Sequence, residues 1–445
     1  MGRLRSATVG ILIVGILIGV VAALMAGASS GLALPGTISS GDTAFVLISS
    51  ALVLIMTPAV GLFYGGMVRS KNISTMINQS IIILAVVSIQ WVLFGYSLAF
   101  GNDVGGVIGG LNFALLNGVG YAPNPAYAAT IPQLVYMIFQ AMFAIVTPAL
   151  IIGAFAERVK LSALVIFTLV WATLVYDPTA HWIWGTGGWA NQLGILDFAG
   201  GTVVHASAGF SALAAVIVIG RRRGVRPGES TPASNIPLVL LGAALLWFGW
   251  FGFNSGSALS AGPLAASAFV ATNTAAAAGG LTWLVLSWAE KGKPSSMAAA
   301  TGAICGLAAV TPASGFVGPI SAMAIGVLAG LATYLALYWL NNRTKIDDTL
   351  GVWPAHGIGG FVGVILTGFF AEAVINPAGN NGLLFGNPGQ VGIQVSVDLI
   401  VVLYSFLVTL AIVYAIDRFI GFRVTEVEEA EGLDLAESGE VGHVD

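Results

Sequence analysis

Two histidines lie inside long apolar stretches of the chain, and each stands at the end of the same short pattern. The pattern is Asp-x-x-Gly-x-x-x-x-His, which ends at His205 in residues 197–205 and at His356 in residues 348–356. A neutral imidazole donates and accepts hydrogen bonds, and it can take up a proton near pH 7. The two rings are therefore either packing residues bonded to backbone or hydroxyl groups, or a facing pair that handles a proton or a polar solute. In an apolar setting we expect both rings to be neutral, or to share one proton.

Two aromatic clusters accompany the histidines. Phe139 and Phe143 are four residues apart, so a helix places them on one face. The second cluster, WFGFNSGS at residues 250–257, sets aromatic rings beside glycines and hydroxyls. Such stripes are common in packing. However, a tryptophan face with an oxygen acceptor can bind a small cation. Phenylalanines deeper in the path would exclude a hydrated ion but let an uncharged molecule through. The residues alone favour a channel-like path for a small polar molecule.

The amino-acid composition indicates which class of protein contains these residues. Only 8% of the 445 residues are charged and 57% are hydrophobic, with a net charge of −4. So few charges could not cover a soluble protein of this length, and they exclude a nucleic-acid binder and a disordered chain. Cys305 is the single cysteine, so no internal disulfide forms and multi-cysteine metal chemistry is excluded. An integral membrane protein remains, and its 59 glycines suit closely packed helices.

A bilayer core requires about 20 mostly apolar residues per helix, and the sequence offers eleven candidates. Each is a continuous apolar run without the alternation of a barrel strand. The spans are expected at about 43–68, 73–100, 131–156, 161–176, 198–220, 236–253, 264–289, 297–310, 320–340, 350–370 and 395–415. The predicted fold class is an all-α integral membrane protein with eleven transmembrane helices.

The basic residues orient these spans. Lysine and arginine follow the odd-numbered spans, and the connections after the even-numbered spans contain neither. The basic residues are Arg69, Lys71, Arg158, Lys160, Arg221, Arg222, Arg223, Arg226, Lys291, Lys293, Arg343, Lys345, Arg418 and Arg423. Because cytoplasmic loops carry the excess of positive charge, the first span starts outside and the tail ends in the cytoplasm.

The two histidine patterns lie on spans that run in opposite directions, the fifth and the tenth. An inverted repeat of five plus five spans, about 42–220 and 236–370, follows from this, with the eleventh span, 395–415, outside it. Many transporters are built in this way, with their path at the repeat interface. We assign residues 42–422 to this membrane domain.

Four aspartates lie near expected span ends. Asp197 has two readings: a cap that fixes the following helix and the loop carrying Trp184, or a negative charge that favours a cation at the outer mouth. Asp348 is its counterpart at the inner end, where we expect a solvated interfacial position. Asp177 and Asp398 are also expected to be interfacial.

The N-terminus, residues 1–35, is expected to be a signal peptide or an additional N-terminal helix. Arg3 and Arg5 precede an apolar run, and Ala26-Gly27-Ala28 offers a small-residue cleavage site. Cleavage would leave the mature N-terminus outside, as eleven spans require, whereas the length of the run also suits a retained helix.

Several longer motifs resemble one known family. They are GLFYGGMVRSKN (61–72), GAFAERVKLSA (153–163), LDFAGGTVVH (196–205), WFGFNSGSA (250–258), VTPASGFVG (310–318) and GVWPAHGIGG (351–360). Together they resemble the ammonium transporter family (Amt/Mep/Rh), and within it the bacterial and archaeal Amt branch. The resemblance covers about residues 42–440.

The resemblance implies roles for individual residues. Ammonium recruitment at the outer mouth falls on Trp184, Ser257 and Phe143, and the pore gate falls on Phe143 and Phe253. The paired pore histidines are His205 and His356, and the outer aspartate, structural or deprotonating, is Asp197. Vestibule and pore support falls on Phe139, Trp250 and Thr311. The resemblance implies no metal, no cofactor and no enzymatic activity.

The acidic tail, residues 423–445, begins with Arg423, and eight acidic residues follow. Such a segment is either simply solvated or regulatory. It resembles the regulatory segment of the family, which engages PII-type signal proteins, although Ser438 stands where many relatives have histidine. Other implied partners are ammonium or ammonia, with methylammonium as an analogue, the lipid bilayer and two further copies in a homotrimer. No nucleic-acid partner is implied.

These observations predict a multi-pass transporter of the cell membrane that serves nitrogen uptake. It would recruit ammonium outside, deprotonate it and conduct ammonia along the two histidines. The proton then either follows by a separate route or stays outside. The alternative is an ammonium sensor with little transport. An ion-coupled transporter of a larger solute would need a wider polar site, and an intramembrane enzyme would need a nucleophile–base or metal-ligand constellation.

Overall fold

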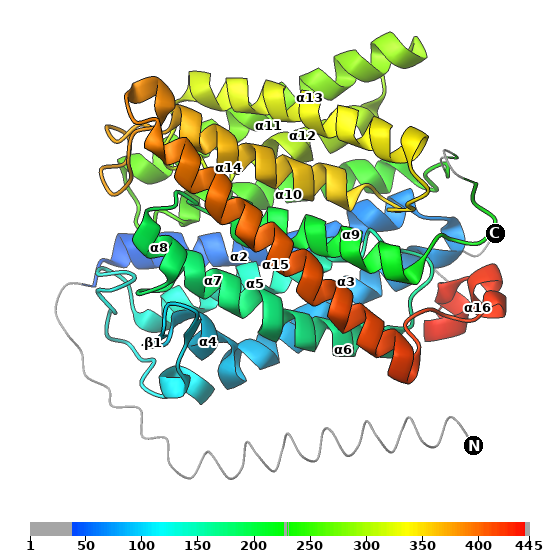
Figure 1. The fold of residues 1–445 in the computed structure, drawn as a ribbon, viewed down its shortest axis with the longest axis horizontal. Helices are drawn as coiled ribbons and strands as arrows, with labels where there is room; N and C mark the ends of the chain where they lie inside the picture. The colour runs from blue at the N-terminus through cyan, green and yellow to red at the C-terminus, as the bar shows by residue number, and fades with distance from the viewer. Residues whose placement is uncertain (1–37, 227–228, 230, 441–445) are drawn as a thin grey trace.

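The computed structural model describes residues 38–226, 229 and 231–440. Its helices run side by side as one bundle (Figure 1). Within this described part, the sheet is a short antiparallel hairpin of β1 (Asp103–Val104) and β2 (Ile108–Gly109). The segment 1–35, expected to be a signal peptide or an additional helix, lies outside the described residues.

Ten helical stretches of the described residues are long and apolar enough to cross a membrane. Six are single helices, namely α2 (Ser40–Met67), α5 (Gln133–Ile151), α10 (Ile236–Gly256), α11 (Pro263–Lys291), α13 (Pro319–Arg343) and α15 (Gly389–Ile420). Two are long composites. The first joins η1 (Ser70–Asn72), α3 (Ile73–Gln90), η2 (Trp91–Gly95) and α4 (Tyr96–Phe100), and the second joins α6 (Leu161–Trp171), η4 (Ala172–Tyr176), α7 (Asp177–Trp184) and α8 (Trp189–Leu193). The last two pair η5 (Gly201–Ala206) with α9 (Ser207–Ile219), and η6 (Trp353–Ile358) with α14 (Gly359–Phe370).

The all-α membrane fold is confirmed, and one of the expected spans is shorter than the others. The eighth expected span, 297–310, is α12 (Ser296–Val310), which has 15 residues and therefore measures about 22 Å. A bilayer core is about 30 Å thick, and α12 is the shortest of the eleven expected spans. The fourth expected span, 161–176, is too short, because the composite helix continues to Leu193.

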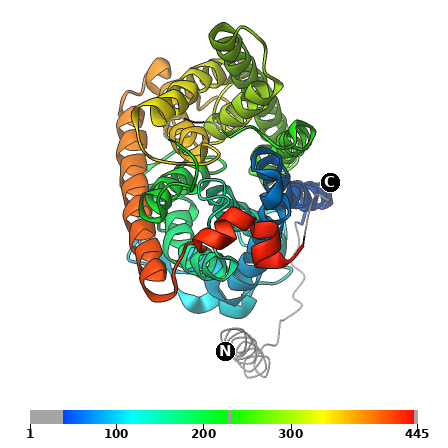
Figure 2. The same ribbon diagram turned by 90° about the vertical axis from the view of Figure 1, so that its right-hand side faces the viewer.

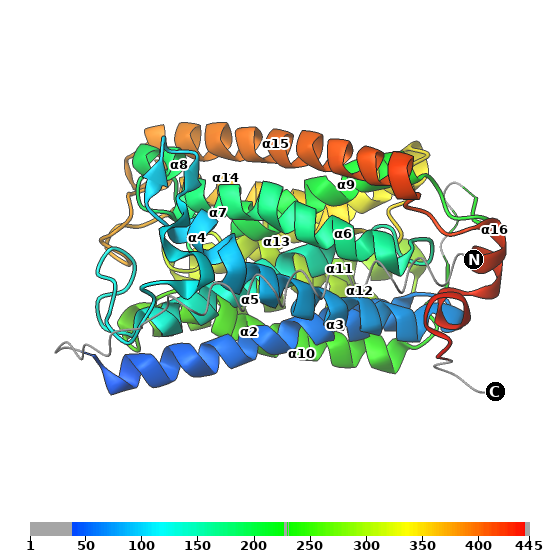
Figure 3. The same cartoon turned by 90° about the horizontal axis from the view of Figure 1, so that it is seen from below.

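The helices divide between the sides of the bundle. Figure 3 shows α15 along one side, with α2 and α10 along the opposite side. Helix α2 packs most extensively against α10, α11 packs against α12 and α13, and α15 packs against α9. The segments η5 and η6, which carry the two histidines, contact each other between these layers.

The glycine of the repeated pattern has a backbone reason. Gly200 has φ 111° and Gly351 has φ 71°, a left-handed region in which a residue with a Cβ is strained. Each glycine ends the loop before a wide π-helical turn, η5 or η6, and π-turns are frequent at functional sites. The pattern therefore encodes a reversal of the chain followed by a widened turn that carries the histidine.

A second pair of glycines brings the two histidine segments together. Gly209 of α9 lies directly on Gly357 of η6, and a Cβ on Gly209 would overlap the backbone of Gly357. Small residues at such a crossing permit close backbone approach in membrane helices. Gly209 lies one turn beyond His205, and Gly357 follows His356, so this contact sets the separation of the two rings.

The tail crosses one end of the bundle, which we call the tail end (Figure 2). Its helices are α16 (Glu426–Glu431) and η8 (Asp434–Ser438). The Asp434 carboxylate accepts hydrogen bonds from the backbone N–H of Ser74 and Thr75, at 3.1 and 2.7 Å. Glu437 accepts one from the N–H of Leu161, at 2.8 Å. The tail therefore caps the first turns of α3 and α6 rather than extending freely into solvent.

Buried charges also gather at the tail end. Arg222 bonds both carboxylate oxygens of Asp347, at 3.0 Å each, and also contacts Glu157, at 3.3 Å. Burial opposes the charges of both acids. Hydrogen bonds and charges from Arg222, with Arg158 beside Asp347 and Arg69 beside Glu157, outweigh it and hold the pKa of each acid below its ordinary value.

Three of the acids expected to be interfacial are buried, so that prediction was wrong. Asp177 and Asp398 are 0% exposed, and Asp348 is 6% exposed. Asp177 lies inside the composite helix Leu161–Leu193 of the fourth span, and α15 begins at Gly389, which places Asp398 well within the bundle. Asp348 is covered because its carboxylate bonds the N–H groups of Val352 and Trp353, at 3.0 and 2.7 Å.

Candidate functional site

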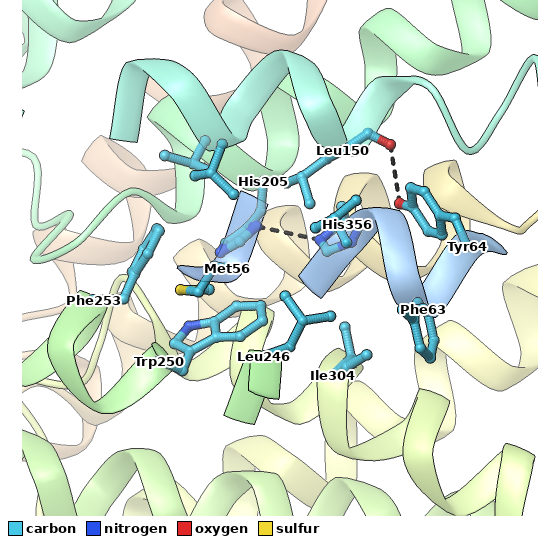
Figure 4. Close-up of a pocket in the computed structure, with 13 residues that line it drawn as sticks. Met56, Phe63, Tyr64, Leu150, His205, Leu246, Trp250, Phe253, Ile304 and His356 are labelled. Atoms are coloured by element: carbon cyan, nitrogen blue, oxygen red, sulfur yellow. Dashed lines mark hydrogen bonds between the residues drawn. The ribbon is translucent and has the colours of Figure 1, made fainter. Parts of the chain in front are cut away.

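The two histidines of the repeated pattern face each other in the centre of the bundle. The Nδ1 atoms of His205 and His356 are 3.3 Å apart, and the rings stack with centroids 5.3 Å apart (Figure 4). The residues are 1% and 4% exposed. Because one nitrogen must donate and the other accept, the pair holds one proton between its Nδ1 atoms. The Nε2 of His205 has no hydrogen-bond partner among the described residues, so it is available to a solute.

The cavity around the histidines is otherwise almost entirely apolar. Trp250 stacks beside His205 at 5.3 Å, and Phe253 lies beside it at 5.9 Å. Tyr64 is the polar exception, but its hydroxyl donates to the Leu150 carbonyl at 3.0 Å. The cavity is lined by Met56, Val60, Phe63, Tyr64, Val146, Leu150, Val204, His205, Leu246, Trp250, Phe253, Ile304 and His356 (Figure 4). Such a lining disfavours an ion and leaves the imidazoles as the polar groups for a solute.

Two phenylalanines close this cavity on the side away from the tail. The rings of Phe143 and Phe253 lie with centroids 4.3 Å apart, and both residues are buried. Phe139 packs edge-on against Phe143 at 5.0 Å and supports it from the same helix face. The ring pair therefore separates the histidine cavity from the space beyond it.

Beyond the ring pair lies a second hollow of about 210 Å³, which we call the vestibule. It is lined by Ala126, Tyr127, Tyr136, Gln140, Phe143, Trp184, Asn191, Phe198, Ser257 and Leu259. Trp184 meets Phe143 edge-to-face at 5.9 Å. The Ser257 hydroxyl donates to the Phe253 carbonyl at 2.9 Å, which leaves its oxygen lone pairs as acceptors. Aromatic rings with an oxygen acceptor can hold a small cation.

Asp197 holds the vestibule and the histidine turn in place. Its carboxylate accepts hydrogen bonds from four consecutive backbone N–H groups, those of Gly200, Gly201, Thr202 and Val203, at 2.6–3.2 Å. Its own carbonyl accepts the indole N–H of Trp184 at 2.8 Å. One residue therefore fixes both the first turn of η5 and the ring of Trp184. At 6% exposure its side chain faces these donors rather than open solvent.

Trp250 is fixed in the same manner. Its indole N–H donates to the Thr311 hydroxyl at 2.9 Å, and that hydroxyl donates to the Leu307 carbonyl at 2.8 Å. Both side chains are buried, so the indole has one satisfied orientation beside His205. All the residues to which the family resemblance assigns a role thus lie in or directly against one line of hollows.

Other residues of this line were not anticipated. Gln140, Tyr136 and Asn191 line the vestibule, and Tyr64 lines the histidine cavity. A polar residue between Phe139 and Phe143 was an available signal for Gln140. Tyr64 had no comparable signal, because its neighbours are apolar and its position follows from the packing of α2 on α5. Among the described residues, no group of three or more His, Cys, Asp or Glu side chains is placed to hold a metal ion.

Fold and site together define a multi-pass membrane protein with an apolar path through its helical bundle. Comparison with known proteins then assigns the family. The model described as "Ammonium Transporter Family" matches residues 44–443. The ammonium transporter Amt1 of Archaeoglobus fulgidus is 49% identical over 405 residues, which cover 91% of this chain and 100% of Amt1. The Bacillus subtilis ammonium transporter is 46% identical and is covered over 99% of its length, with 91% of this chain.

Solved structures agree with this assignment. Mep2 of Candida albicans superposes with a TM-score of 0.83 at 36% identity, over 88% of each chain. A structure described as "Sensor Amt Protein" gives the same TM-score at 29% identity, over 89% of this chain and 98% of its own. The chain belongs to the ammonium transporter family, a family of membrane transporters and not of enzymes.

Proposed function

We propose that this protein transports ammonium across the cell membrane for nitrogen uptake. Ammonium is held in the vestibule by Trp184, Phe143 and Ser257. It loses a proton there, and ammonia passes the Phe143–Phe253 ring pair and moves along His205 and His356. The observation that supports this most is the order of the three features along one line: vestibule, ring pair and histidine cavity.

The vestibule and the histidine cavity differ in chemistry. This difference explains why ammonium would stay outside the Phe143–Phe253 ring pair while ammonia passes it. The vestibule offers aromatic faces and an oxygen acceptor, which suit a cation. The histidine cavity offers an apolar wall, where an unpaired charge is very costly, and imidazole nitrogens that both donate and accept. Ammonia is a donor and an acceptor, so the histidine pair can replace part of its hydration.

The fate of the proton determines whether transport carries current. In one form of the proposal only ammonia crosses, and in the other the proton crosses by a separate route. Proteoliposomes given an ammonium jump distinguish the two, because only net charge transfer produces a current. A current in active vesicles supports separate proton transfer, and active vesicles without one support conduction of ammonia alone.

The alternative function is that of an ammonium sensor with little transport. The observation that favours a sensor is the similarity to the structure described as "Sensor Amt Protein". Purified protein that binds methylammonium in the vestibule but does not move it into vesicles would support the sensor.

We also propose the placement and assembly of the protein. The tail end faces the cytoplasm, because the basic connections gather there, and the mature N-terminus lies outside if residues 1–35 are cleaved. N-terminal sequencing tests the cleavage, and an intact Met1 would contradict it.

The protein forms a homotrimer in the lipid bilayer, with a separate path in each copy and five plus five spans as an inverted repeat. Mass measurement in detergent tests the trimer.

The tail is proposed to regulate transport and to engage a PII-type signal protein. Its acids already bond the first turns of α3 and α6, so a partner that binds the tail reaches the cytoplasmic helix ends directly. A pull-down with a cognate PII protein, with and without nucleotides and 2-oxoglutarate, tests this. Absence of binding under every condition would contradict the partner.

A further inference from the structure

Asp398 is a buried acid that the transport path described above does not use. It lies on α15 and is 0% exposed, and neither of its carboxyl oxygens has a hydrogen-bond partner among the described residues. The Thr202 hydroxyl lies near the carboxyl, and Asp197 is close enough for its charge to act on Asp398. A buried polar group without a partner requires an explanation, and a carboxyl group more than most.

The surrounding contacts show that this face of α15 is built to hold the loop before η5. Gln394, one turn before Asp398, donates to the Leu196 carbonyl at 2.7 Å and accepts the Leu196 N–H at 2.8 Å. Gln390, a further turn away, donates to the Gly194 carbonyl at 2.9 Å. Asp398 is the next polar residue of the same face, and it lies opposite the first turn of η5, against which α15 packs.

Thr202 connects the two carboxyl groups. Its backbone N–H donates to Asp197 at 2.9 Å, while its hydroxyl is buried and without a partner beside Asp398. A hydrogen bond between this hydroxyl and the Asp398 carboxyl would satisfy both groups at once. Leaving them unsatisfied would be costly, because each group loses its hydrogen bonds to water on burial without a replacement.

The donors around the two acids differ sharply. Asp197 accepts four backbone N–H bonds, which suit an ionised carboxylate. Asp398 faces no N–H donor and no cation among the described residues, and its ionised neighbour would repel a second negative charge. An uncharged carboxylic acid, with one O–H donor, is the form that this position accommodates.

We propose that Asp398 is a positioning residue, held as a neutral carboxylic acid that donates its O–H to the Thr202 hydroxyl. The bond fixes the first turn of η5, three residues before His205, and the outer end of the path then carries one negative charge, on Asp197. This inference rests on the proposed function, because it assigns Asp398 a part in placing the groups of the transport path.

Conservative and non-conservative variants test the proposal in opposite directions. Asp398→Asn retains a donor for Thr202 but cannot ionise, so methylammonium uptake should stay within about twofold of the original protein. Asp398→Leu and Thr202→Val remove the bond, and a lost positioning contact of about 1.4 kcal/mol should reduce uptake about tenfold. Thr202→Ser, which keeps the hydroxyl, should transport normally. Thr202→Val is close to isosteric, so it retains the test if Asp398→Leu fails to fold.

Two results would overturn the proposal. If Asp398→Asn lost uptake as completely as Asp398→Leu, an exchangeable proton would be required at this position. If Asp398→Leu and Thr202→Val both transported normally, the bond would position nothing.

Infrared spectroscopy separates this proposal from the proposed function. At pH 7 the C=O band of a protonated carboxylic acid should decrease in Asp398→Asn and remain in Glu431→Gln, a control in the exposed part of the tail. An unchanged band in Asp398→Asn contradicts a neutral Asp398. The spectrum requires no transport, so it decides the protonation of Asp398 even if the original protein moves no methylammonium, a result that would refute only the proposed function.

Discussion

The Nδ1 atoms of His205 and His356 lie 3.3 Å apart, although 151 residues separate them in the chain. Each ring stands on a π-helical turn that follows a left-handed glycine, and Gly209 packed on Gly357 sets the distance between the turns. Two copies of one sequence pattern thus meet at a single point. This contact is the centre of the proposed path, and the predictions below test the groups that surround it.

Phe253→Ala should open the path to ions. Removing the ring leaves a space beside Phe143 that water can enter, and water lowers the cost of a charge in the cavity. We expect vesicles containing the variant to release potassium faster than those containing the original protein. Phe251→Ala is the matched control, because Phe251 lies on the same helix but stacks on Phe269, at 3.9 Å, away from the cavity. Equal potassium release from both variants would contradict the ring pair as a barrier.

Thr311→Val should destabilise the protein through Trp250. The substitution keeps the shape of the side chain but leaves the buried indole N–H without its acceptor, which costs about 1–3 kcal/mol. Thermal unfolding in detergent should therefore start at a lower temperature, whereas Thr311→Ser, which keeps the hydroxyl, should unfold like the original protein. Unchanged unfolding of Thr311→Val would show that Trp250 finds another acceptor.

Arg222→Met should destabilise the protein in a pH-dependent way. Arg222 is the shared partner of Asp347 and Glu157, and removing one partner of a buried ion pair costs about 3–5 kcal/mol at neutral pH. The folded pKa values of both acids lie below their ordinary values, so the stabilisation is complete above about pH 5 and is lost as the pH falls through the ordinary and then the folded values.

The stability difference between Arg222→Met and the original protein should therefore be largest at pH 7 and shrink in acid. Arg221→Met is the control, because Arg221 is more exposed and, among the described residues, its side chain bonds only the Lys345 carbonyl. A difference that persists unchanged at acid pH would mean that packing, rather than the ion pairs, stabilises this end.

Asp434→Ala should release the tail. The substitution leaves the N–H groups of Ser74 and Thr75 without their acceptor, and losing such a cap costs about 1 kcal/mol. Limited proteolysis should then cut the tail several times faster, while Glu431→Ala, at an exposed position, leaves the rate unchanged. Equal cutting rates would show that two other contacts, Glu437 with the Leu161 N–H and Arg423 with Glu429, hold the tail without Asp434.

The spans and the central pair were predictable because they depend on features that a sequence displays directly. Long apolar runs mark helices, and an ionisable residue inside such a run stands out, as His205 does. The prediction that Asp177, Asp348 and Asp398 are interfacial was wrong for a related reason. Distance from an expected span end does not measure exposure, because the helices extend further than the apolar runs and the backbone donors that cover Asp348 are visible only in three dimensions.

The local backbone geometry could not be predicted from the sequence either. The spacing of Gly200 before His205 was evident, but its left-handed conformation and the π-helical turn depend on Asp197 bonding four N–H groups at once. The vestibule likewise combines Trp184, Ser257 and Gln140 from three separate helical stretches, and only packing brings them together.

Uptake of radiolabelled methylammonium into proteoliposomes tests the central claim most directly. The account predicts uptake by the original protein well above that of empty liposomes, competition by ammonium, and a marked loss in both His205→Ala and His356→Ala. Losing one hydrogen bond of about 1 kcal/mol to the solute corresponds to about a fivefold slower passage. Uptake no greater than in empty liposomes, or unaltered rate and selectivity in both histidine variants, would contradict it.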